Sequence, residues 1–200
     1  MASSFSLAEQ ERKIESKIVV ALERVSEAFR VLLWNESKEF ALSPIQVQIL
    51  IFLLFHTQEK CKVGYLADEF NMTKATISDS VKVLLQKKLV DKIQDEYDTR
   101  SFTIRLTPKG KEIAKKSSLF TGQFEKPLNQ LTLSQKEVML NGLLRLIYDL
   151  NRAGVITVQR MCFTCNHYEV TGSKQYCTLL QATLHDKDLR VDCPEHEMLA

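Results

Sequence analysis

The stretch Val63-Gly-Tyr-Leu-Ala-Asp-Glu-Phe-Asn-Met-Thr-Lys-Ala-Thr-Ile-Ser78 decides the fold of this chain. It predicts two short helices joined by a tight turn, the first over Val63–Phe70 and the second beginning after Thr73, which is a good N-cap residue. Apolar side chains of the second helix share one face, while the opposite face carries small and polar residues. This pattern is typical of a helix-turn-helix, whose second helix presents its leading edge to DNA.

The polar face of the second helix supplies the candidate DNA contacts. Lysine and hydroxyl side chains at such an edge can reach phosphates or base edges, and a helix N-terminus is itself favourable beside a phosphate. The candidate residues are Thr73, Lys74, Thr76, Ser78 and Lys82. The alternative for each lysine is an ordinary solvated helix face.

Two predicted strands follow, Leu89–Ile93 and Ser101–Leu106, on either side of a polar tip. This hairpin predicts a wing beside the helix-turn-helix. Arg100 on the tip suits the narrow minor groove of DNA and is the sixth candidate contact, although an ion pair with Asp98 is an alternative role. Residues 62–116 carry twelve Lys and Arg against eight Asp and Glu, a modest surplus of the charge that phosphates attract.

Long helices are predicted on both sides of this region. The expected segments are one helix over Leu7–Glu39, a buried helix from Ser43-Pro44 to Phe55, a helix from Thr107-Pro108 towards Leu131, and a last long helix that opens with a capping box at Ser134–Glu137 and ends at Ala153-Gly154. The apolar stripes of the first and last helices exceed what one small domain covers. The sequence therefore predicts a homodimer.

This order of elements resembles the MarR family. The resemblance is carried by the opening stretch, by Leu84-Leu-Gln-Lys-Lys-Leu-Val90, and by Asp98-Thr-Arg100 followed by Leu106-Thr-Pro-Lys-Gly110, and it covers about three-quarters of the chain. It implies a homodimer built from the first and last helices, a recognition helix in the major groove and wings that reach the minor groove. One departure is Ser101, where the family often has an arginine.

Four of the five cysteines lie in the tail. Cys162 and Cys165 form a Cys-x-x-Cys pair, Cys177 and Cys193 follow singly, and a short helix over Leu179–Leu184 is expected between them. Such a cluster predicts a tetrahedral zinc site that stabilises the fold of this small segment. The alternatives are an iron–sulfur cluster bound by the same four cysteines and a thiol–disulfide switch without a metal. The isolated Cys61 is expected to be a buried small hydrophobe.

The expected fold class is mostly α with a small β-wing, divided into a winged helix domain with its dimerisation helices (1–157) and a cysteine-rich tail (158–200). The longest apolar run, Ile49–Phe55, is too short to cross a membrane, and the first residues lack a signal-peptide pattern, so we predict a cytoplasmic protein without a membrane partner. The predicted function is that of a transcriptional regulator that binds a pseudo-palindromic operator in double-stranded DNA and is modulated by a small-molecule effector or by the metal or redox state of the tail.

No catalytic constellation accompanies these motifs, so we predict that the chain is not an enzyme. Two alternatives from other classes stay open. A redox protein would use Cys162 and Cys165, although no βαβ pattern surrounds that pair. A protein-interaction adaptor would use the winged helix and the tail as docking surfaces.

Overall fold

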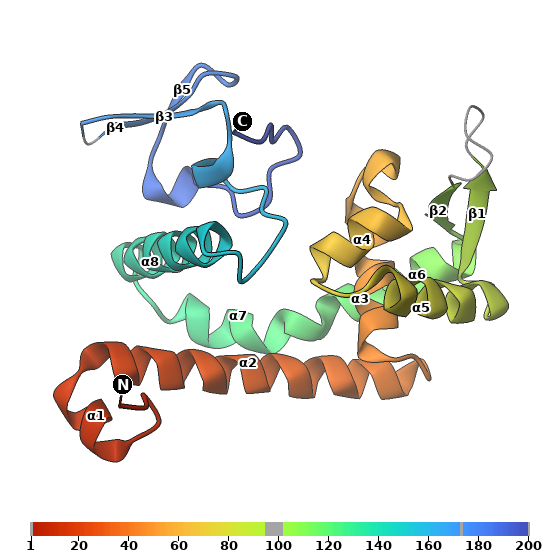
Figure 1. Cartoon of the computed structure of the whole chain (residues 1–200), viewed down its shortest axis with the longest axis horizontal. Helices are drawn as coiled ribbons and strands as arrows, with labels where there is room; N and C mark the ends of the chain where they lie inside the picture. Colours follow the sequence, from red (N-terminus) through yellow and green to blue (C-terminus); the bar gives the residue numbers. More distant parts are fainter. Residues whose placement is uncertain (1, 95–101, 173, 200) are drawn as a thin grey trace.

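A computed structural model describes residues 2–94, 102–172 and 174–199. The helices are α1 (Leu7–Arg12), α2 (Ile14–Glu39), α3 (Pro44–Phe55), α4 (Val63–Glu69), α5 (Lys74–Gln86), α6 (Pro108–Ser117), α7 (Gly122–Asn129) and α8 (Leu133–Arg152). The strands are β1 (Val90–Gln94), β2 (Phe102–Leu106), β3 (Tyr168–Thr171), β4 (Lys174–Cys177) and β5 (Ala182–Leu184). A winged helix-turn-helix of α3–α5 with β1 and β2 lies at one end, the tail lies on α8, and α2 runs below both (Figure 1).

The first core forms around α3, which is apolar on nearly every side. Its N-terminus carries a capping box, in which the Gln46 N–H donates to the Ser43 hydroxyl and the Gln46 side chain accepts from the Ser43 N–H. The buried side chains of α3 are Gln46, Val47, Ile49, Leu50, Phe52 and Leu53. Leu66 of α4 and Ile77 of α5 are fully buried against them. The predicted burial of this helix is confirmed.

The wing is a two-stranded antiparallel sheet of β1 and β2, as predicted from the sequence. The Ile104 N–H donates to the Cys61 carbonyl at 2.8 Å, which attaches β2 to the loop before α4. Gly110 lies so close to the end of the helix-turn-helix that a Cβ there would be 1.8 Å from the Leu89 carbonyl oxygen. Only glycine permits this approach of α6 to the residue just before β1.

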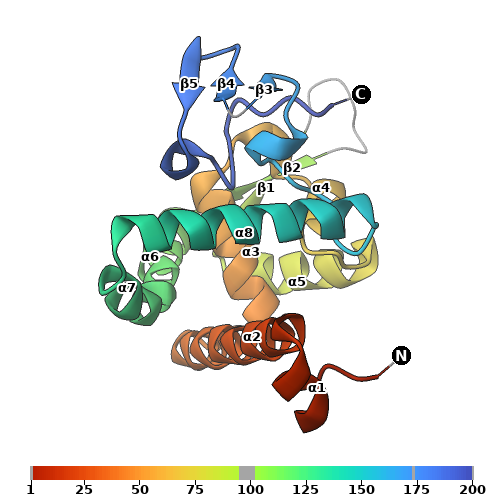
Figure 2. The same ribbon diagram turned by 90° about the vertical axis from the view of Figure 1, so that its left-hand side faces the viewer.

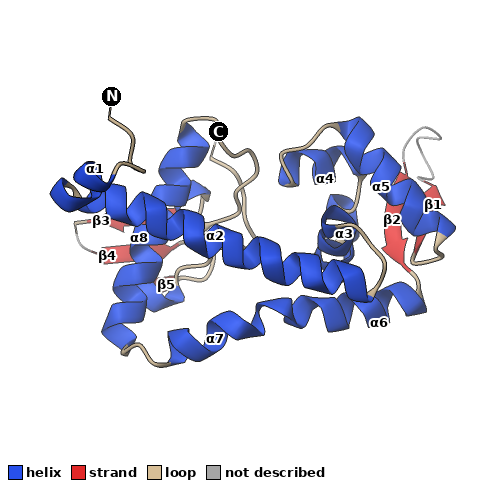
Figure 3. Ribbon diagram, turned by 90° about the horizontal axis from the view of Figure 1, so that it is seen from below, coloured by secondary structure: helices blue, strands red, loops and turns tan. Residues whose placement is uncertain are grey.

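The first long helix is interrupted, so the prediction of one helix over Leu7–Glu39 is wrong in detail. Lys13 has an extended backbone (φ −131°, ψ 123°) and separates α1 from α2. No apolar side chain of α2 is fully buried. Its Phe29 stacks on Phe124 of α7, with ring centroids 4.1 Å apart, and its Leu33 packs against the first core. Figure 3 shows α2 running diagonally across this face of the molecule, with α7 and α6 along one side of it.

Two further helix predictions need correction. The helix that begins at Pro108 ends at Ser117, and a 3₁₀ turn over Ser118–Thr121 separates it from α7. The capping box of α8 is formed by Thr132 with Gln135 and not by Ser134 with Glu137. Both pairs have the required spacing, but only Thr132 has the extended backbone of an N-cap (φ −64°, ψ 161°).

The tail contains a three-stranded antiparallel sheet in the order β3-β4-β5, which the sequence did not predict. The expected helix over Leu179–Leu184 is wrong, because a turn with Gln181 at φ 50° brings residues 182–184 back to pair with β4. The tail packs on α8 through a second core of Leu144, Met161, Leu184 and Leu189. Figure 2 shows the tail and α2 on opposite sides of α8. The division of the chain at residue 157 stays a prediction.

In the part of the chain that the structure describes, no single helix is long and apolar enough to cross a membrane. The pair α2 and α3 meets that criterion jointly, by length and composition, but the two helices are bent by 89° at their junction.

Candidate nucleic-acid interface and cysteine cavity

The turn between α4 and α5 is built by local hydrogen bonds. Asn71 takes the left-handed conformation (φ 52°), and the Met72 N–H donates to the Ala67 carbonyl at 2.8 Å. Thr73 then caps α5, because its hydroxyl accepts from the Thr76 N–H at 3.1 Å. The predicted N-cap is confirmed. The first turn of α5 is thereby fixed at the surface.

The predicted contact residues of α5 lie on its exposed side. All five are solvent-exposed, whereas the inward face buries other side chains of the helix. The exposed set is Thr73, Lys74, Thr76, Ser78 and Lys82, and the buried set is Ile77, Ser80, Val81 and Leu84. The hydroxyls of Thr73 and Thr76 are 2.9 Å apart and bond to each other. Lys74 and Lys82 are eight residues apart, which is about 12 Å along the helix.

Arg100 lies outside the described residues, so its contact stays a prediction. Sequence reasoning missed two cations on the described part of the wing, Lys92 and Arg105, both exposed. The Lys92 ammonium lies 4.1 Å from the ring centroid of Phe102. The outward positions of the alternating strand were the signal that could have identified them.

The four cysteines of the tail line one cavity, which we call the cysteine cavity. It has a volume of about 30 Å³, and Tyr168, Leu179, Leu180 and Leu184 form much of its apolar wall. The cysteines come from different segments: Cys162 and Cys165 from a 3₁₀ turn, Cys177 from the end of β4, and Cys193 from the C-terminal loop. The fold thus gathers the residues that the spacing singled out.

Two of the sulfur atoms accept hydrogen bonds from Arg190. Its backbone N–H lies 3.2 Å from the Cys162 Sγ, and its guanidinium lies 3.3 Å from the Cys193 Sγ. Burial raises the pKa of the Cys162 thiol, although the bond from Arg190 acts against this. All five cysteines are free. Among the described residues, no group of three or more His, Cys, Asp or Glu is arranged, as it stands, to hold a metal ion.

Cys61 takes no part in the cysteine cavity. Its side chain is completely buried in the first core, and its thiol donates to the Thr57 carbonyl at 3.2 Å. Burial raises the pKa of Cys61 to about 11. Its predicted place as a buried small hydrophobe is confirmed.

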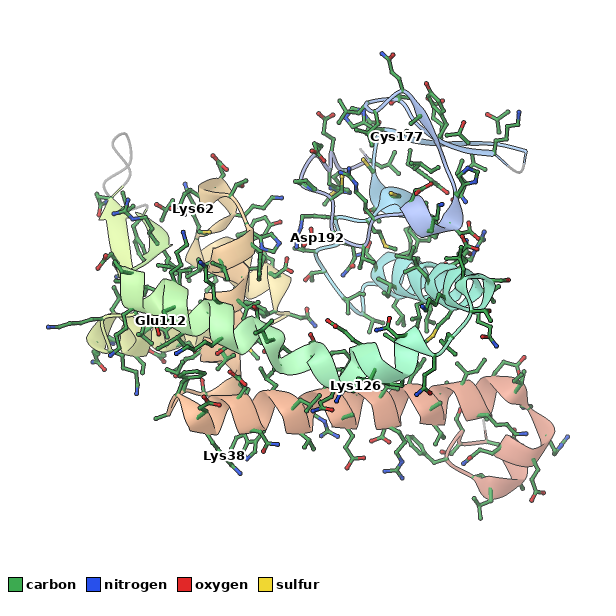
Figure 4. The ribbon with its side chains drawn as sticks, turned by 180° about the vertical axis from the view of Figure 1, so that it is seen from behind. Lys38, Lys62, Glu112, Lys126, Cys177 and Asp192 are labelled. Carbon is green, nitrogen blue, oxygen red and sulfur yellow. The ribbon has the colours of Figure 1, made fainter. Side chains whose placement is uncertain are left out.

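A buried arginine joins the tail to the helix-turn-helix. The Arg160 guanidinium contacts Glu69 at 2.6 and 3.2 Å and Asp192 at 2.6 and 3.1 Å, a paired geometry with each carboxylate. It also donates to the Tyr65 hydroxyl at 2.8 Å, and His56 lies 2.8 Å from Asp192. We call these five residues the Arg160 cluster. Figure 4 shows Asp192 on the side of the tail that faces the winged helix-turn-helix.

Hydrogen bonds and opposite charges in the Arg160 cluster stabilise the charged forms of Arg160 and Asp192. Burial alone would lower the pKa of Arg160, but its hydrogen bonds to Glu69 and Asp192 raise it above the ordinary value. Hydrogen bonds from His56 and Arg160 hold the pKa of Asp192 well below its usual range. Sequence reasoning missed this cluster, because its members are spread over more than 130 positions and share no motif.

The segment between α8 and the tail contacts the turn of the helix-turn-helix directly. The Asn71 side chain donates to the Val155 carbonyl at 3.4 Å, and the Thr157 hydroxyl donates to the Asp68 carbonyl. These two contacts and the Arg160 cluster all involve α4 or the residues just after it. The tail and the segment before it therefore contact the helix-turn-helix and α8 at the same time.

The winged part of the chain is similar to proteins of known family and structure. The family model described as MarR family matches residues 42–101. The structure of MepR of S. aureus in complex with DNA is 23% identical, with 66% of this chain and 97% of that chain covered and a TM-score of 0.58. The structure of S. aureus MepR in a DNA-binding conformation is 23% identical, with 66% of this chain and 98% of that chain covered and a TM-score of 0.59. A MarR protein from Peptoclostridium difficile is 20% identical, with 70% of this chain and 92% of that chain covered and a TM-score of 0.60.

At these identities the similar structures establish the fold, a mostly helical winged helix of the MarR type. They are covered almost completely while about a third of this chain is left over, so the cysteine-rich tail is an addition to the shared fold. No curated protein sequence matches the chain.

Proposed function

Residues 42–101 belong to the MarR family of winged helix-turn-helix proteins, and on that premise we propose that the chain is a DNA-binding transcriptional regulator. The observation that carries the proposal is α5. It is capped, exposed along one side, and presents lysines and hydroxyls there while its apolar face is buried. That division of faces is what a recognition helix in the major groove requires.

The spacing of the two lysines on α5 supports this orientation. Lys74, Ser78 and Lys82 follow one another at four-residue intervals, so they share one side of the helix, and the two lysines are about 12 Å apart along it. Phosphates that flank the groove are then within reach of the two ammonium groups. Ser78, which lies between them on the same side, faces the base edges. The lysines supply affinity and salt dependence, and the hydroxyl supplies sequence preference.

We propose further that the regulator is a homodimer formed through α2 and α8. These helices expose many large apolar side chains, which in a monomer would form an unusually extensive apolar surface. They are Ile14, Ile18, Val19, Val25, Phe29, Val31 and Trp34 on α2, and Leu133, Val138, Met139, Leu146 and Leu150 on α8. A second copy of the chain covers them and presents two α5 helices to a pseudo-palindromic operator.

Two kinds of signal fit a regulator with this architecture. A small-molecule effector would find an open groove of about 530 Å³ between α2 and α7, lined by Ala28, Val31 and Phe124 among others. The second signal is the state of the tail. We favour the tail, because its Arg160 cluster and the Asn71–Val155 contact reach the helix-turn-helix itself.

Selection from a random pool of DNA duplexes with the full chain tests this function. We expect an enriched inverted repeat whose half-site centres lie about 10 base pairs apart. Binding to it should fall steeply with salt between 50 and 200 mM, and Lys74→Ala and Lys82→Ala should each flatten the slope of log K against log salt by about 0.9. Lys126→Ala on α7 removes the same charge far from α5 and should leave the slope unchanged.

If no duplex is enriched, the DNA-binding proposal fails and the adaptor alternative becomes the better account. If a duplex is enriched but both α5 variants bind it as the wild type does, the DNA surface lies elsewhere on the molecule.

A further inference from the structure

Cys193 has a cation and a carboxylate beside its sulfur. The Arg190 guanidinium donates to the Cys193 Sγ at 3.3 Å, and the Cys193 thiol donates to the Glu195 carboxylate at 3.4 Å. Arg190 and Glu195 also pair with each other at 2.6 Å, which holds both groups in place. A carboxylate so placed can accept the thiol proton, and the guanidinium then balances the negative charge left on the sulfur. Cys193 therefore has the surroundings of a reactive nucleophile.

Solvent reaches Cys193 but not every cysteine. Cys61 is completely buried and Cys165 is 6% exposed, whereas Cys193 is half-buried. The side chains of Arg190 and Glu195 beside it are 39% and 49% exposed. A small molecule dissolved in water can thus approach the Cys193 sulfur. Access together with a favourable environment of the sulfur is what selects one cysteine for oxidation.

A second thiol, that of Cys162, is held next to the segment of Cys193. The Cys193 N–H donates to the Arg160 carbonyl at 2.8 Å, and the Cys162 N–H donates to the Arg190 carbonyl at 3.1 Å. The Arg190 N–H in turn donates to the Cys162 Sγ at 3.2 Å, so one residue contacts both sulfurs. Both cysteines also line the cysteine cavity. Cys162 is therefore placed to react with an oxidised Cys193.

We propose that Cys193 is a site of oxidation by hydrogen peroxide and that Cys162 then forms a disulfide with it. In the first step the Cys193 sulfur bonds to one peroxide oxygen as the O–O bond breaks, which gives a sulfenic acid and one water molecule. In the second step the Cys162 sulfur displaces the hydroxyl group, which leaves with the Cys162 proton as a second water molecule. The two thiols lose two electrons in all, and the peroxide takes up both. This is the thiol–disulfide switch that the sequence left open.

The disulfide links the two halves of the Arg160 cluster. Arg160 precedes Cys162 by two residues. Asp192 precedes Cys193 by one residue and pairs with Arg160 at 2.6 Å. A covalent bond between the two segments keeps this pair together, and with it the contact of Arg160 with Glu69 on α4, so oxidation stiffens the tail on the helix-turn-helix. The effect on DNA binding rests on the proposed function, whereas the oxidation of Cys193 does not.

Peptide mass spectrometry of the full chain tests the modification. The chain is purified in dithiothreitol, freed of the reductant, exposed to hydrogen peroxide and then alkylated in urea. We expect a disulfide between Cys162 and Cys193 that dithiothreitol removes, with the other three cysteines alkylated. Cys162→Ser should stop at a sulfenic acid on Cys193, which dimedone traps, and Cys193→Ser should keep Cys162 as a thiol. Cys61→Ser, the matched control, should form the disulfide as the wild type does.

The rate of oxidation tests the contacts of Cys193. Arg190→Met removes the cation but keeps the backbone donor to Cys162, and Glu195→Gln removes the carboxylate. Each should slow the loss of the Cys193 thiol by about tenfold, the factor that one charge-assisted hydrogen bond contributes. Arg24→Met on α2 is the matched control and should be oxidised at the wild-type rate. Melting curves establish that every variant folds, and wild-type rates in both Arg190→Met and Glu195→Gln would refute the assigned roles.

Other results would overturn the proposal as a whole. A disulfide between other cysteines would show that Cys193 is not the reactive thiol. Five intact thiols after exposure to peroxide would show that the chain has no such site. One zinc ion per chain in the purified protein, retained in peroxide, would favour the zinc site predicted from the sequence.

A second experiment compares DNA binding before and after oxidation on the duplex selected above. We expect affinities that differ by about tenfold, within the usual 5- to 150-fold range of coupling between two sites. Dithiothreitol should restore the first affinity, and Cys162→Ser, which forms no disulfide, should lack the difference. Equal binding in both states would refute the coupling and leave the oxidation in place, whereas no binding in either state would refute the DNA-binding function instead.

Discussion

Replacement of Arg160 by methionine tests whether the tail is fastened to the helix-turn-helix as the structure has it. Methionine keeps much of the side-chain volume but removes the charge and every donor. The Arg160 side chain is only 8% exposed, and its guanidinium donates to the two carboxylates of Glu69 and Asp192 and to the Tyr65 hydroxyl. The variant leaves those groups without their common partner.

The size of the effect follows from how buried the partners are. Removal of one member of a buried ion pair costs about 3–5 kcal/mol, because the other member stays in a poorly solvated place. Here the Glu69 side chain is 18% exposed and the Asp192 side chain 45%, so water can reach Asp192 once Arg160 is gone. We therefore expect the variant to lose about 2–3 kcal/mol of the free energy that holds the tail on the helix-turn-helix. This corresponds to about a 30- to 140-fold increase in the fraction of molecules with the tail detached.

Hydrogen exchange measures how far the tail loosens once it is detached. The Cys162 and Cys193 amides are bonded within the tail to the Arg190 and Arg160 carbonyls, and they exchange when the tail opens. Their exchange should accelerate in the variant, because Arg160 and Asp192 no longer anchor the two segments that carry these bonds, while amides of α3 keep their rates. Arg24→Met is the matched control, since Arg24 and its partner Glu27 are 71% and 48% exposed and such a pair contributes about 0.2–1 kcal/mol. Equal exchange in Arg160→Met and the wild type would refute the fastening.

Three further predictions concern other parts of the molecule. Gly110→Ala should lower the free energy of unfolding in urea by about 3 kcal/mol, because the added Cβ would collide with the backbone of Leu89. Gly142→Ala, whose added Cβ has no atom within 4 Å, should raise that free energy by about 0.5–1 kcal/mol. Similar free energies of unfolding for the two variants would contradict this. Cys61 should be the last thiol alkylated in the native chain at pH 8, because its pKa of about 11 leaves little thiolate; early labelling by mass spectrometry would argue against its burial. Ile18→Glu with Val138→Glu should give a monomer in light scattering without unfolding, and a persistent dimer would exclude this surface.

The winged domain could be predicted from sequence because its signals are local. The capping box of Ser43 with Gln46 and the Thr73 cap act within one helical turn, and the alternation of β2 acts within one strand. The choice of α5 as the helix with the candidate DNA contacts followed from those signals. The break at Lys13 could not be predicted in this way, because the apolar periodicity continues across it.

The tail shows the opposite case. Spacing identified its four ligand candidates, but it gave no access to their arrangement, since β5 folds back on β4 only through the left-handed turn at Gln181. Arg160 is the clearest example. Its partners are His56, Tyr65 and Glu69 on one side and Asp192 on the other, and only the packed structure brings them together.

These observations give the tail a definite mechanical place in the proposed regulator. Its core buries Leu144 of α8, a helix we assign to the dimer interface, while Arg160 holds Glu69 of α4, which packs against the reading helix. In the proposed dimer, we therefore expect the tail to set the distance between the dimer interface and α5. The separation of two α5 helices decides whether both enter successive major grooves about 34 Å apart. We expect a change that loosens the cysteine cavity to alter that separation in the proposed dimer without contacting DNA, and such differential fit is what a switch between two affinities requires.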